Sequence, residues 1–369
     1  MSKFNIPPIS TLSGSTFWNY VKAIKSGRVE WTYYHKVLLT GLVCGLASPF
    51  HFWEKIRTPR YSKLNNSPLF ILGHWRSGTT FLHNLLCHDP NAAFVSTYQS
   101  LFPNNMHSQF IFKNFMKMNM PDKRPSDNVQ LGIDLPQEDE FALGNMQRLS
   151  FYDVFYFPDG FEELFNQTIA FEGVSQKVTD QWKSAYKELI NKALKHSPGT
   201  HPILKNPVNT GRVDKLLELY PNAKFLHIYR NPVVVYLSIK KFFLSLFPTL
   251  QFQRTTEKQL GDLIMKLYAR LMKRYLDQRQ LIPGEQLFEL RFENFEEDPM
   301  RYVEEVYKSL NFSNWDNAKS NIQKYIVSQS GYQKNSYRIS KPELDSVVKE
   351  WDFAFKAFDY DLPENIEII

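Results

Sequence analysis

The stretch Pro68-Leu-Phe-Ile-Leu-Gly-His-Trp-Arg-Ser-Gly-Thr-Thr-Phe-Leu-His-Asn-Leu-Leu86 decides the fold, because it combines a short strand, a glycine-bounded loop and a helix. Its apolar start, Leu69 to Leu72, has the length of a buried strand, and apolar residues at helical spacing follow the loop. Glycine-loop N–H groups and a helix N-terminus attract anions, and Thr79 and Thr80 add hydroxyl donors. The stretch predicts a phosphate-binding loop, with an ordinary strand-to-helix turn as the alternative.

The loop has the glycine spacing of a Walker A motif but lacks its lysine. Four residues separate Gly73 from Gly78, and Thr79-Thr80 stands where the motif has Lys-Ser/Thr. The cation of the loop is instead Arg76, two residues before the second glycine. Kinases and nucleotide triphosphatases use the lysine to reach the outer phosphates. The sequence therefore argues against ATP hydrolysis and favours a different phosphate-like ligand.

Composition indicates a folded protein. The chain has 369 residues, of which 43% are hydrophobic, enough to bury a substantial core. Its formal charge of +6 suits an anionic ligand or membrane face, and no Lys/Arg block predicts nucleic-acid binding. Cys44 and Cys87 offer neither a disulfide framework nor a zinc spacing. With no signal-peptide pattern at the N-terminus, we expect a cytoplasmic protein.

We expect residues 1–65 to form an N-terminal extension and residues 66–369 to form the catalytic domain. The most apolar run, residues 37–50, is too short to span a bilayer as one helix and contains Pro49. Aromatic and cationic residues flank this run on both sides within residues 31–57. Such flanks are typical of an interfacial membrane element, so peripheral membrane contact is one interpretation. The alternative is a helix that covers the main domain.

Beyond residue 65, strands and helices alternate, which predicts a three-layer α/β fold of the P-loop type with a central parallel sheet flanked by helices. Residues 103–135 are expected to form a long loop with some helix. Strands are expected at 69–72, 93–98, 224–229 and 287–295. Helices are expected after Gly78, at 210–220, from Asn231-Pro232, at 260–275, at 303–310 and at 343–358.

A second anion-binding constellation is Tyr229-Arg230-Asn-Pro-Val-Val-Val-Tyr-Leu-Ser238. The strand delivers Arg230 to the carboxyl edge of the sheet, where open α/β folds bind their ligands. Ser238 follows about 10 Å further along the next helix. A Walker B strand would end in aspartate to hold Mg²⁺, whereas this strand ends in arginine. The pattern predicts a second anion site, set apart from the first and built without a metal, although an arginine at a strand end is also common in ion pairs.

Both motifs together resemble the sulfotransferase superfamily, whose donor is 3′-phosphoadenosine 5′-phosphosulfate (PAPS). Residues 73–80 are similar to its 5′-phosphosulfate loop, and residues 228–238 to its 3′-phosphate motif. Ile203-Leu-Lys-Asn-Pro207, Leu290-Arg-Phe-Glu-Asn-Phe295 and Gly331-Tyr-Gln-Lys-Asn-Ser-Tyr337 add weaker similarities. The resemblance covers about residues 66–360 and is strongest to microbial-type enzymes with a Trp-Arg-Ser-Gly-Thr-Thr loop.

The resemblance implies the sulfotransferase fold, PAPS as cofactor, adenosine 3′,5′-bisphosphate as product and no metal. Arg76 would neutralise charge on the oxygen that leaves with the nucleotide, and Arg230 with Ser238 would hold the 3′-phosphate. Lys334 or Asn335 in the C-terminal loop would close over it. The loop residues that the resemblance assigns to donor binding are Gly73, His74, Trp75, Arg76, Ser77, Gly78, Thr79 and Thr80.

An acceptor hydroxyl needs a general base, and members of the superfamily use histidine or glutamate. Leu135-Pro-Gln-Glu-Asp-Glu-Phe141 is the densest acidic cluster that we expect outside a helix. Mutual repulsion among three carboxylates would raise the pKa of one of them. We rank Glu138 first, Glu140 second and Asp139 third as the base. A solvated acidic turn, or an ion pair with Arg148, is the alternative, and His107 and His74 are weaker candidates.

The acceptor is less determined than the donor. The aromatic residues after the acidic cluster would suit a lipid, sterol-like or aromatic alcohol, although ordinary core packing explains most of them. Two other functions stay open: a P-loop kinase of nucleotides or small molecules, and a non-catalytic nucleotide-binding protein of the same fold. The eight rings concerned are Phe141, Phe151, Tyr152, Phe155, Tyr156, Phe157, Phe161 and Phe165.

Overall fold

The structure is a computed structural model that describes residues 11–57, 67–120, 132–329, 337–363 and 366–369. The chain divides into two units, each assembled from separate segments. Unit 1 contains residues 1–64, 94–196 and 244–256, and unit 2 contains residues 65–93, 197–243 and 257–369. The predicted boundary between extension and catalytic domain, at residue 65, stays a prediction.

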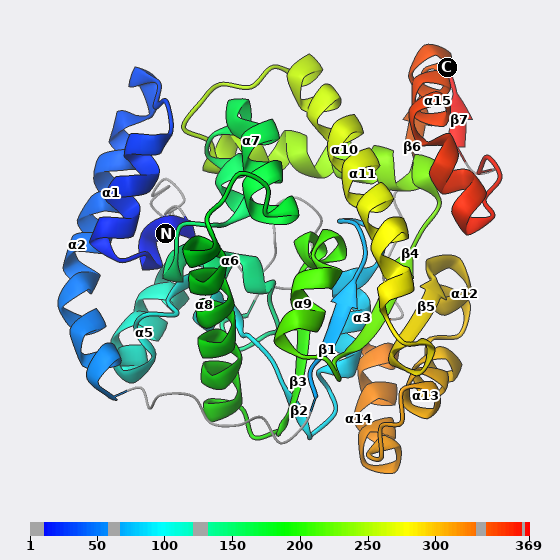
Figure 1. Ribbon diagram of the computed structural model, residues 1–369, viewed down its shortest axis with the longest axis horizontal. Coiled ribbons are helices and arrows are strands. Elements are labelled where there is room, and N and C mark those ends of the chain that lie inside the picture. Colours follow the sequence, from blue (N-terminus) through cyan, green and yellow to red (C-terminus); the bar gives the residue numbers. More distant parts are fainter. Residues whose placement is uncertain (1–10, 58–66, 121–131, 330–336, 364–365) are drawn as a thin grey trace. The chain divides into compact units, whose positions relative to one another are not determined.

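A five-stranded parallel sheet forms the centre of unit 2 (Figure 1). Its strand order is β2-β3-β1-β4-β5, so β1 lies between β3 and β4 with Leu69 opposite Ile203 and Lys224. All four residues of β1 are buried, as expected for a central strand covered on both faces. The strands are β1 (Leu69–Leu72), β2 (Ala92–Ala93), β3 (His201–Lys205), β4 (Lys224–Tyr229) and β5 (Leu287–Arg291).

Helices and a small second sheet complete unit 2. The longest helix that lies wholly in this unit, α11, buries a stripe that includes Leu260, Ile264, Leu267 and Leu271. Strands β6 (Tyr337–Ile339) and β7 (Ile366–Ile368) pair in parallel. The helices are α3 (Thr79–Leu86), α9 (Val213–Leu219), α11 (Glu257–Gln278), α12 (Phe292–Glu297), α13 (Pro299–Ser309), α14 (Trp315–Ser328) and α15 (Lys341–Phe358). Helix α10 (Pro232–Leu250) begins in unit 2 and ends in unit 1.

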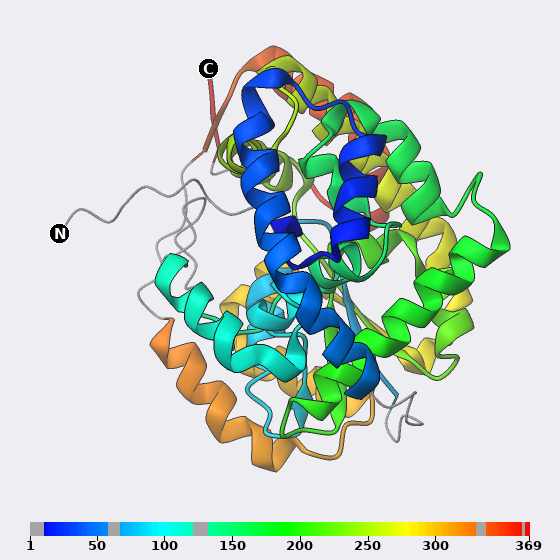
Figure 2. The same cartoon turned by 90° about the vertical axis from the view of Figure 1, so that its left-hand side faces the viewer.

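Unit 1 is helical in its described residues. Helices α1 and α2 lie side by side (Figure 2), and one core cluster of the unit contains Ala47, Tyr98, Phe102 and Phe112. The helices are α1 (Phe17–Ser26), α2 (Tyr34–Arg57), α4 (Thr97–Leu101), α5 (Gln109–Asn119), α6 (Asp139–Met146), α7 (Phe161–Phe165) and α8 (Gln176–Lys195).

The predicted elements are confirmed at β1, α3, β4, α11, α13 and α15. Asn231 also caps α10 as predicted, because its Oδ1 accepts a hydrogen bond of 3.0 Å from the N–H of Val233. The strand expected at 93–98 is wrong beyond Ala93, since Ser96 and Gln99 form a capping box that begins α4. The strand expected at 287–295 ends at Arg291, where α12 takes over.

Candidate active site

The loop between β1 and α3 requires left-handed backbone at three positions. Gly73 has φ +140°, Arg76 +72° and Gly78 +96°. A Cβ on Gly73 would lie 2.4 Å from the Ile228 carbonyl oxygen, and one on Gly78 would lie 2.2 Å from the Phe292 ring. Both glycines are therefore needed for backbone conformation and for close packing against the neighbouring chain.

Several side chains of this loop are buried in the interior of unit 2 and hold the loop in its conformation. His74 is 1% exposed, its Nδ1–H donates to the Trp75 carbonyl oxygen at 2.9 Å, and its ring meets the Tyr268 ring at 4.9 Å. Burial lowers the pKa of His74 to about 3, so the imidazole is neutral at physiological pH. Trp75, Ser77 and Thr79 are buried as well. Of the loop side chains, those of Arg76 and Thr80 are more exposed.

Strand β4 and helix α10 bring the second motif into direct contact with the loop. The Arg76 Nε–H donates to Ser238 Oγ at 2.9 Å, and Arg230 Nη1 donates to the Arg76 carbonyl oxygen at 3.5 Å. Arg76 therefore contacts both Ser238 and Arg230 of the second motif, and the expectation of two anion sites set apart from each other stays a prediction. Arg76 follows β1 and Arg230 follows β4. Because the carboxyl ends of parallel strands lie at the same edge of a sheet, the two side chains come together there.

Arg230 is mostly buried. Its guanidinium carbon lies 4.2 Å from the centre of the Phe292 ring. Burial lowers the pKa of Arg230, while the Glu293 carboxylate opposes that effect. Glu293 itself accepts hydrogen bonds from the Asn231 N–H at 3.2 Å and from the Tyr360 hydroxyl at 2.5 Å. A bound anion would offset the cost of desolvating the guanidinium group.

Lys205 is the site residue whose role sequence reasoning missed. It ends β3, pairs in register with Ile71 of β1 and is 2% exposed. Its Nζ lies 3.5 Å from Thr80 Oγ1, at the first turn of α3. The available signal was a cation that ends an apolar strand, Ile203-Leu-Lys205, the same signal that identified Arg230.

The acidic cluster of unit 1 begins a helix, so the expectation of a non-helical setting is wrong. Glu138 is the residue before α6, and Asp139 and Glu140 lie in its first turn, where acidic side chains favour the positive helix end. Both of these are completely buried. Asp139 Oδ2 accepts from the Tyr186 hydroxyl at 2.9 Å. Glu140 Oε1 accepts from Ser150 Oγ at 3.0 Å and from the Phe151 N–H at 2.9 Å.

Glu138 differs from its two neighbours because it is only half-buried. Its Oε2 accepts a hydrogen bond from the Tyr152 hydroxyl. The ion pair of Arg148 is formed with Asp153 and not with the acidic cluster, and burial raises the pKa of Asp153 against that pairing. His107 lies in a 3-10 turn of unit 1, where its backbone N–H donates to Glu54 Oε2 at 2.9 Å.

The aromatic residues after the acidic cluster are core, as the alternative interpretation held. Seven of the eight rings are buried and Phe141 is half-buried. Tyr152 packs on Phe141 and Phe155, with ring centres 4.6 Å and 4.9 Å apart. Lys334 and Asn335, the predicted closing residues, lie outside the described residues.

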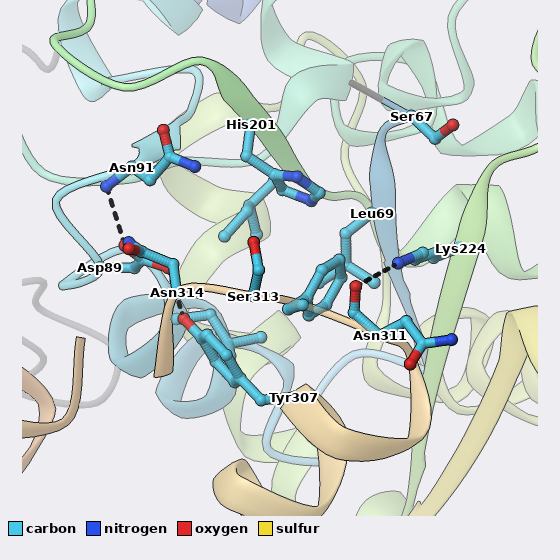
Figure 3. A pocket seen from close by; sticks show the side chains of 13 residues that line it. Ser67, Leu69, Asp89, Asn91, His201, Lys224, Tyr307, Asn311, Ser313 and Asn314 are labelled. Atoms are coloured by element: carbon cyan, nitrogen blue, oxygen red, sulfur yellow. Dashed lines mark hydrogen bonds between the residues drawn. The ribbon is translucent and has the colours of Figure 1, made fainter. Parts of the chain in front are cut away.

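A cavity of about 310 Å³ lies at the other edge of the sheet, where the strands begin (Figure 3). Its Asp89 carboxylate accepts from the Tyr307 hydroxyl and the Asn314 amide, both at 2.6 Å, and from the Asn91 N–H at 2.8 Å. Lys224 Nζ donates to the Asn311 carbonyl oxygen at 3.2 Å. Because open α/β sheets bind ligands at the opposite edge, this cavity is not part of the candidate active site.

Comparison with known proteins matches residues 68–317 to the model of the sulfotransferase family. Two mycobacterial relatives, from Mycobacterium bovis and Mycobacterium tuberculosis, are each named omega-hydroxy-beta-dihydromenaquinone-9 sulfotransferase Stf3. Each is 28% identical over 331 residues, which cover 89% of this chain and 85% of the relative.

Two solved structures have the same fold. The crystal structure of sulfotransferase STF9 from Mycobacterium avium has a TM-score of 0.72 at 16% identity, covering 98% of this chain and 99% of its own. That of sulfotransferase STF1 from Mycobacterium tuberculosis has a TM-score of 0.63 at 15% identity, covering 92% and 93%. At these identities the likeness establishes the fold alone.

Proposed function

The chain belongs to the sulfotransferase family and is a sulfotransferase, and from that premise we propose that it transfers the sulfuryl group of PAPS to the hydroxyl of a lipid alcohol. The carboxyl edge of the unit 2 sheet supports the choice of donor. Its chemistry fits an anion with two charged ends, because it presents two guanidinium groups, an ammonium group and several hydroxyls. Each of these can donate hydrogen bonds to phosphate-type oxygens.

One observation carries the proposal: Arg230, Arg76 and Ser238 form a connected set of hydrogen bonds, with Arg76 as the shared member. In this proposal Arg230 and Ser238 hold the 3′-phosphate. The N–H groups of residues 78–80 and the hydroxyls of Ser77, Thr79 and Thr80 hold the 5′-phosphosulfate, whereas the Ser77 N–H donates to the His74 carbonyl oxygen at 3.2 Å. Bound PAPS supplies an activated sulfuryl group that an alcohol oxygen can attack in line.

Arg76 and Lys205 would stabilise the charge that develops as the sulfur–oxygen bond to the nucleotide breaks. A fixed cation acts strongly on such charge because it needs no reorganisation during the reaction. Lys205 is buried beside Thr80 and Arg76 is held by Ser238, so both side chains are positioned before the ligand binds. As the new sulfur–oxygen bond forms, the acceptor hydroxyl gives up its proton.

We propose Glu138 as the base that takes this proton. Asp139 and Glu140 are completely buried. Asp139 accepts a hydrogen bond from Tyr186, and Glu140 accepts from Ser150 and Phe151, so both residues hold the turn in place. Glu138 is half-buried, and the Tyr152 hydroxyl orients its carboxylate. A carboxylate with one solvent-facing side can receive a proton without losing the packing of the turn.

The lipid character of the acceptor is proposed from the relatives. The name of Stf3 describes a hydroxyl on a menaquinone, which is a lipid. The buried rings of unit 1 add no support, because they pack on one another as core. A cytoplasmic location stays a prediction.

Transfer of ³⁵S-labelled sulfate from PAPS tests the function. The purified protein would be assayed with hydroxylated polyprenyl quinones and long-chain alcohols, and with phenols and sugars of matched hydroxyl number as controls. We expect product with the lipid alcohols and little with sugars. Labelled sugars without labelled lipids would contradict the acceptor class, and no transfer to any alcohol would contradict PAPS as donor.

A further inference from the structure

Helix α2 of unit 1 is amphipathic, but its small and polar side chains are buried and its large apolar side chains are exposed. Its buried face includes Thr40, Cys44, Ala47 and Glu54, which recur at helical spacing and are mostly small or polar. Cys44 Sγ donates to the Leu12 carbonyl oxygen at 3.3 Å. Glu54 accepts from the His107 N–H at 2.9 Å and pairs with Lys192 at 3.6 Å. This face is fixed to the rest of unit 1.

The opposite face of α2 is apolar and exposed along the helix. No charged residue occurs from Val37 to Trp53. Spacings of three, four and seven residues place the exposed side chains on one stripe. Their exposed fractions are Leu38 71%, Leu42 60%, Leu46 66%, Phe52 68%, Trp53 57% and Ile56 65%.

A water-facing helix places its large apolar side chains inside, and α2 places them outside. Contiguous exposed apolar surface of this kind marks a binding face. Helix α11 gives the ordinary pattern within the same chain, because Leu260, Leu263, Leu267 and Leu271 are buried. The stripe on α2 therefore requires a partner that is apolar along about five helical turns.

The surroundings of the stripe select a lipid bilayer as that partner. Trp31 is 82% exposed at one end of α2, and Phe52 and Trp53 are exposed at the other, as in interfacial aromatic belts. On α1, Trp18 is 72% exposed and shares a face with the exposed Lys22 and Lys25.

The charges of this region favour an anionic leaflet. From residue 11 to residue 53 the sequence holds four Lys/Arg and a single acidic residue, Glu30. The Glu30 carboxylate accepts a hydrogen bond of 2.8 Å from the Arg254 N–H. Exposed cations beside an apolar stripe attract acidic headgroups. A second copy of the chain would meet the same cations and be repelled by them.

Helix α2 is long and apolar enough to span a membrane, but its inner face argues against spanning. Two helices among the described residues pass this test. Trp31–Glu54 has 28% of its window buried, and Pro232–Leu250 has 56%. Spanning would detach the Glu54 and Cys44 contacts and place a carboxylate near lipid. We propose that α2 lies flat in the headgroup region of an anionic bilayer, with Leu38, Leu42 and Leu46 towards the acyl chains. This surface does not depend on the proposed donor or acceptor.

Vesicle sedimentation of the full-length protein tests the surface. Vesicles would contain phosphatidylcholine with or without phosphatidylglycerol. We expect Leu42→Glu/Leu46→Glu to weaken binding by about a hundredfold or more, since each leucine contributes about tenfold. The matched control is Leu281→Glu/Val327→Glu, two exposed apolar residues of unit 2 that are 53% and 61% exposed. Thermal melts followed by circular dichroism would show that both variants fold.

Two further arms identify the partner and the orientation. Replacing Lys22 and Lys25 by alanine should weaken binding to anionic vesicles about fivefold per lysine and leave neutral vesicles unaffected. Alkaline carbonate should release the bound protein, because it does not span. The proposal is overturned if the unaltered protein does not bind vesicles, if the leucine variant binds equally well, or if carbonate leaves it in the membrane. Analytical ultracentrifugation is the last check. A dimer of the unaltered protein that is absent in Leu42→Glu/Leu46→Glu would show that the stripe binds a second copy and would overturn the proposal.

Discussion

Two charged regions of the molecule differ in how their side chains are held. They are the cationic edge of unit 2 (Arg76, Lys205 and Arg230) and the acidic turn of unit 1 (residues 138–140). At the edge, Arg76 and Lys205 donate to the hydroxyls of Ser238 and Thr80, which fixes the cations for a ligand. At the turn, buried donors bind Glu140, and Glu138 stays half-buried. Binding of an anion needs only charges that are held in place, whereas proton transfer also needs a group that the acceptor can reach. Changes at the edge should alter donor affinity, and changes at the turn should alter turnover.

The largest effect is expected at the turn. Glu138→Gln should lower kcat by about 10²- to 10⁴-fold while donor affinity stays the same, because glutamine keeps the shape but accepts no proton. Steady-state rates and donor titration measure both. Glu140→Gln is the matched control, expected to lower the unfolding free energy by about 1–3 kcal/mol through its buried hydrogen bonds. Full turnover in Glu138→Gln would remove this residue as the base.

At the edge, Arg230→Ala should weaken adenosine 3′,5′-bisphosphate binding by about tenfold to a hundredfold, the loss of a charged hydrogen bond. Isothermal calorimetry gives the dissociation constant. Arg301→Ala is the control, because Arg301 is an exposed arginine of unit 2 paired with Glu305. Equal losses in the two variants would show a general charge effect and no site.

Acid should destabilise the fold through neutral buried histidines. Burial lowers the pKa of His74 and of His83 to about 3 from 6.5, so the unfolded chain binds more protons between these values. Stability is therefore full above pH 6.5 and falls as pH drops towards 3, by about 1.4 kcal/mol per histidine at pH 5.5. Urea unfolding at several pH values checks this. His74→Phe should flatten the dependence, and an unchanged slope would show that His74 is protonated in the fold.

The smallest effect is expected from Ser238→Ala. Losing one neutral hydroxyl should weaken bisphosphate binding about fivefold, the equivalent of about 1 kcal/mol. Arg76 also loses its partner, so the kcat of this variant should fall with its donor affinity. Ser346→Ala, on the exposed side of α15, is the control for a serine outside the edge. If both serine variants bind the bisphosphate as tightly as the unaltered protein does, Ser238 does not contribute to binding it.

Much of the edge could be predicted from sequence because its geometry is local. Glycine spacing predicted the loop, and a cation after an apolar strand predicted Arg230. Arg76 has φ +72°, a left-handed conformation that a sequence normally indicates only by a glycine. The direction of its side chain, and so its contact with Ser238, could not be foreseen. Lys205 needed the register of β3 against β1, which is a long-range property.

The acidic turn was harder to predict, because proximity in sequence does not determine burial. Asp139 and Glu140 are buried by partners 10 to 47 residues away, and no local pattern indicates them. The strand expected at 93–98 failed for a local reason, since Ser96 and Gln99 form a capping box that begins helix α4. The assembly of unit 1 from three separate segments also lies beyond local patterns.

Calorimetry with three ligands tests whether the carboxyl edge of the unit 2 sheet binds a nucleotide through phosphates at both of its ends. Adenosine 3′,5′-bisphosphate, adenosine 5′-monophosphate and ATP with Mg²⁺ would be titrated into the unaltered protein and Arg230→Ala. We expect the bisphosphate to bind most tightly and Arg230→Ala to remove its advantage over the monophosphate. Tighter binding of ATP with Mg²⁺, or equal weakening of both adenosine monophosphate and bisphosphate, would contradict it.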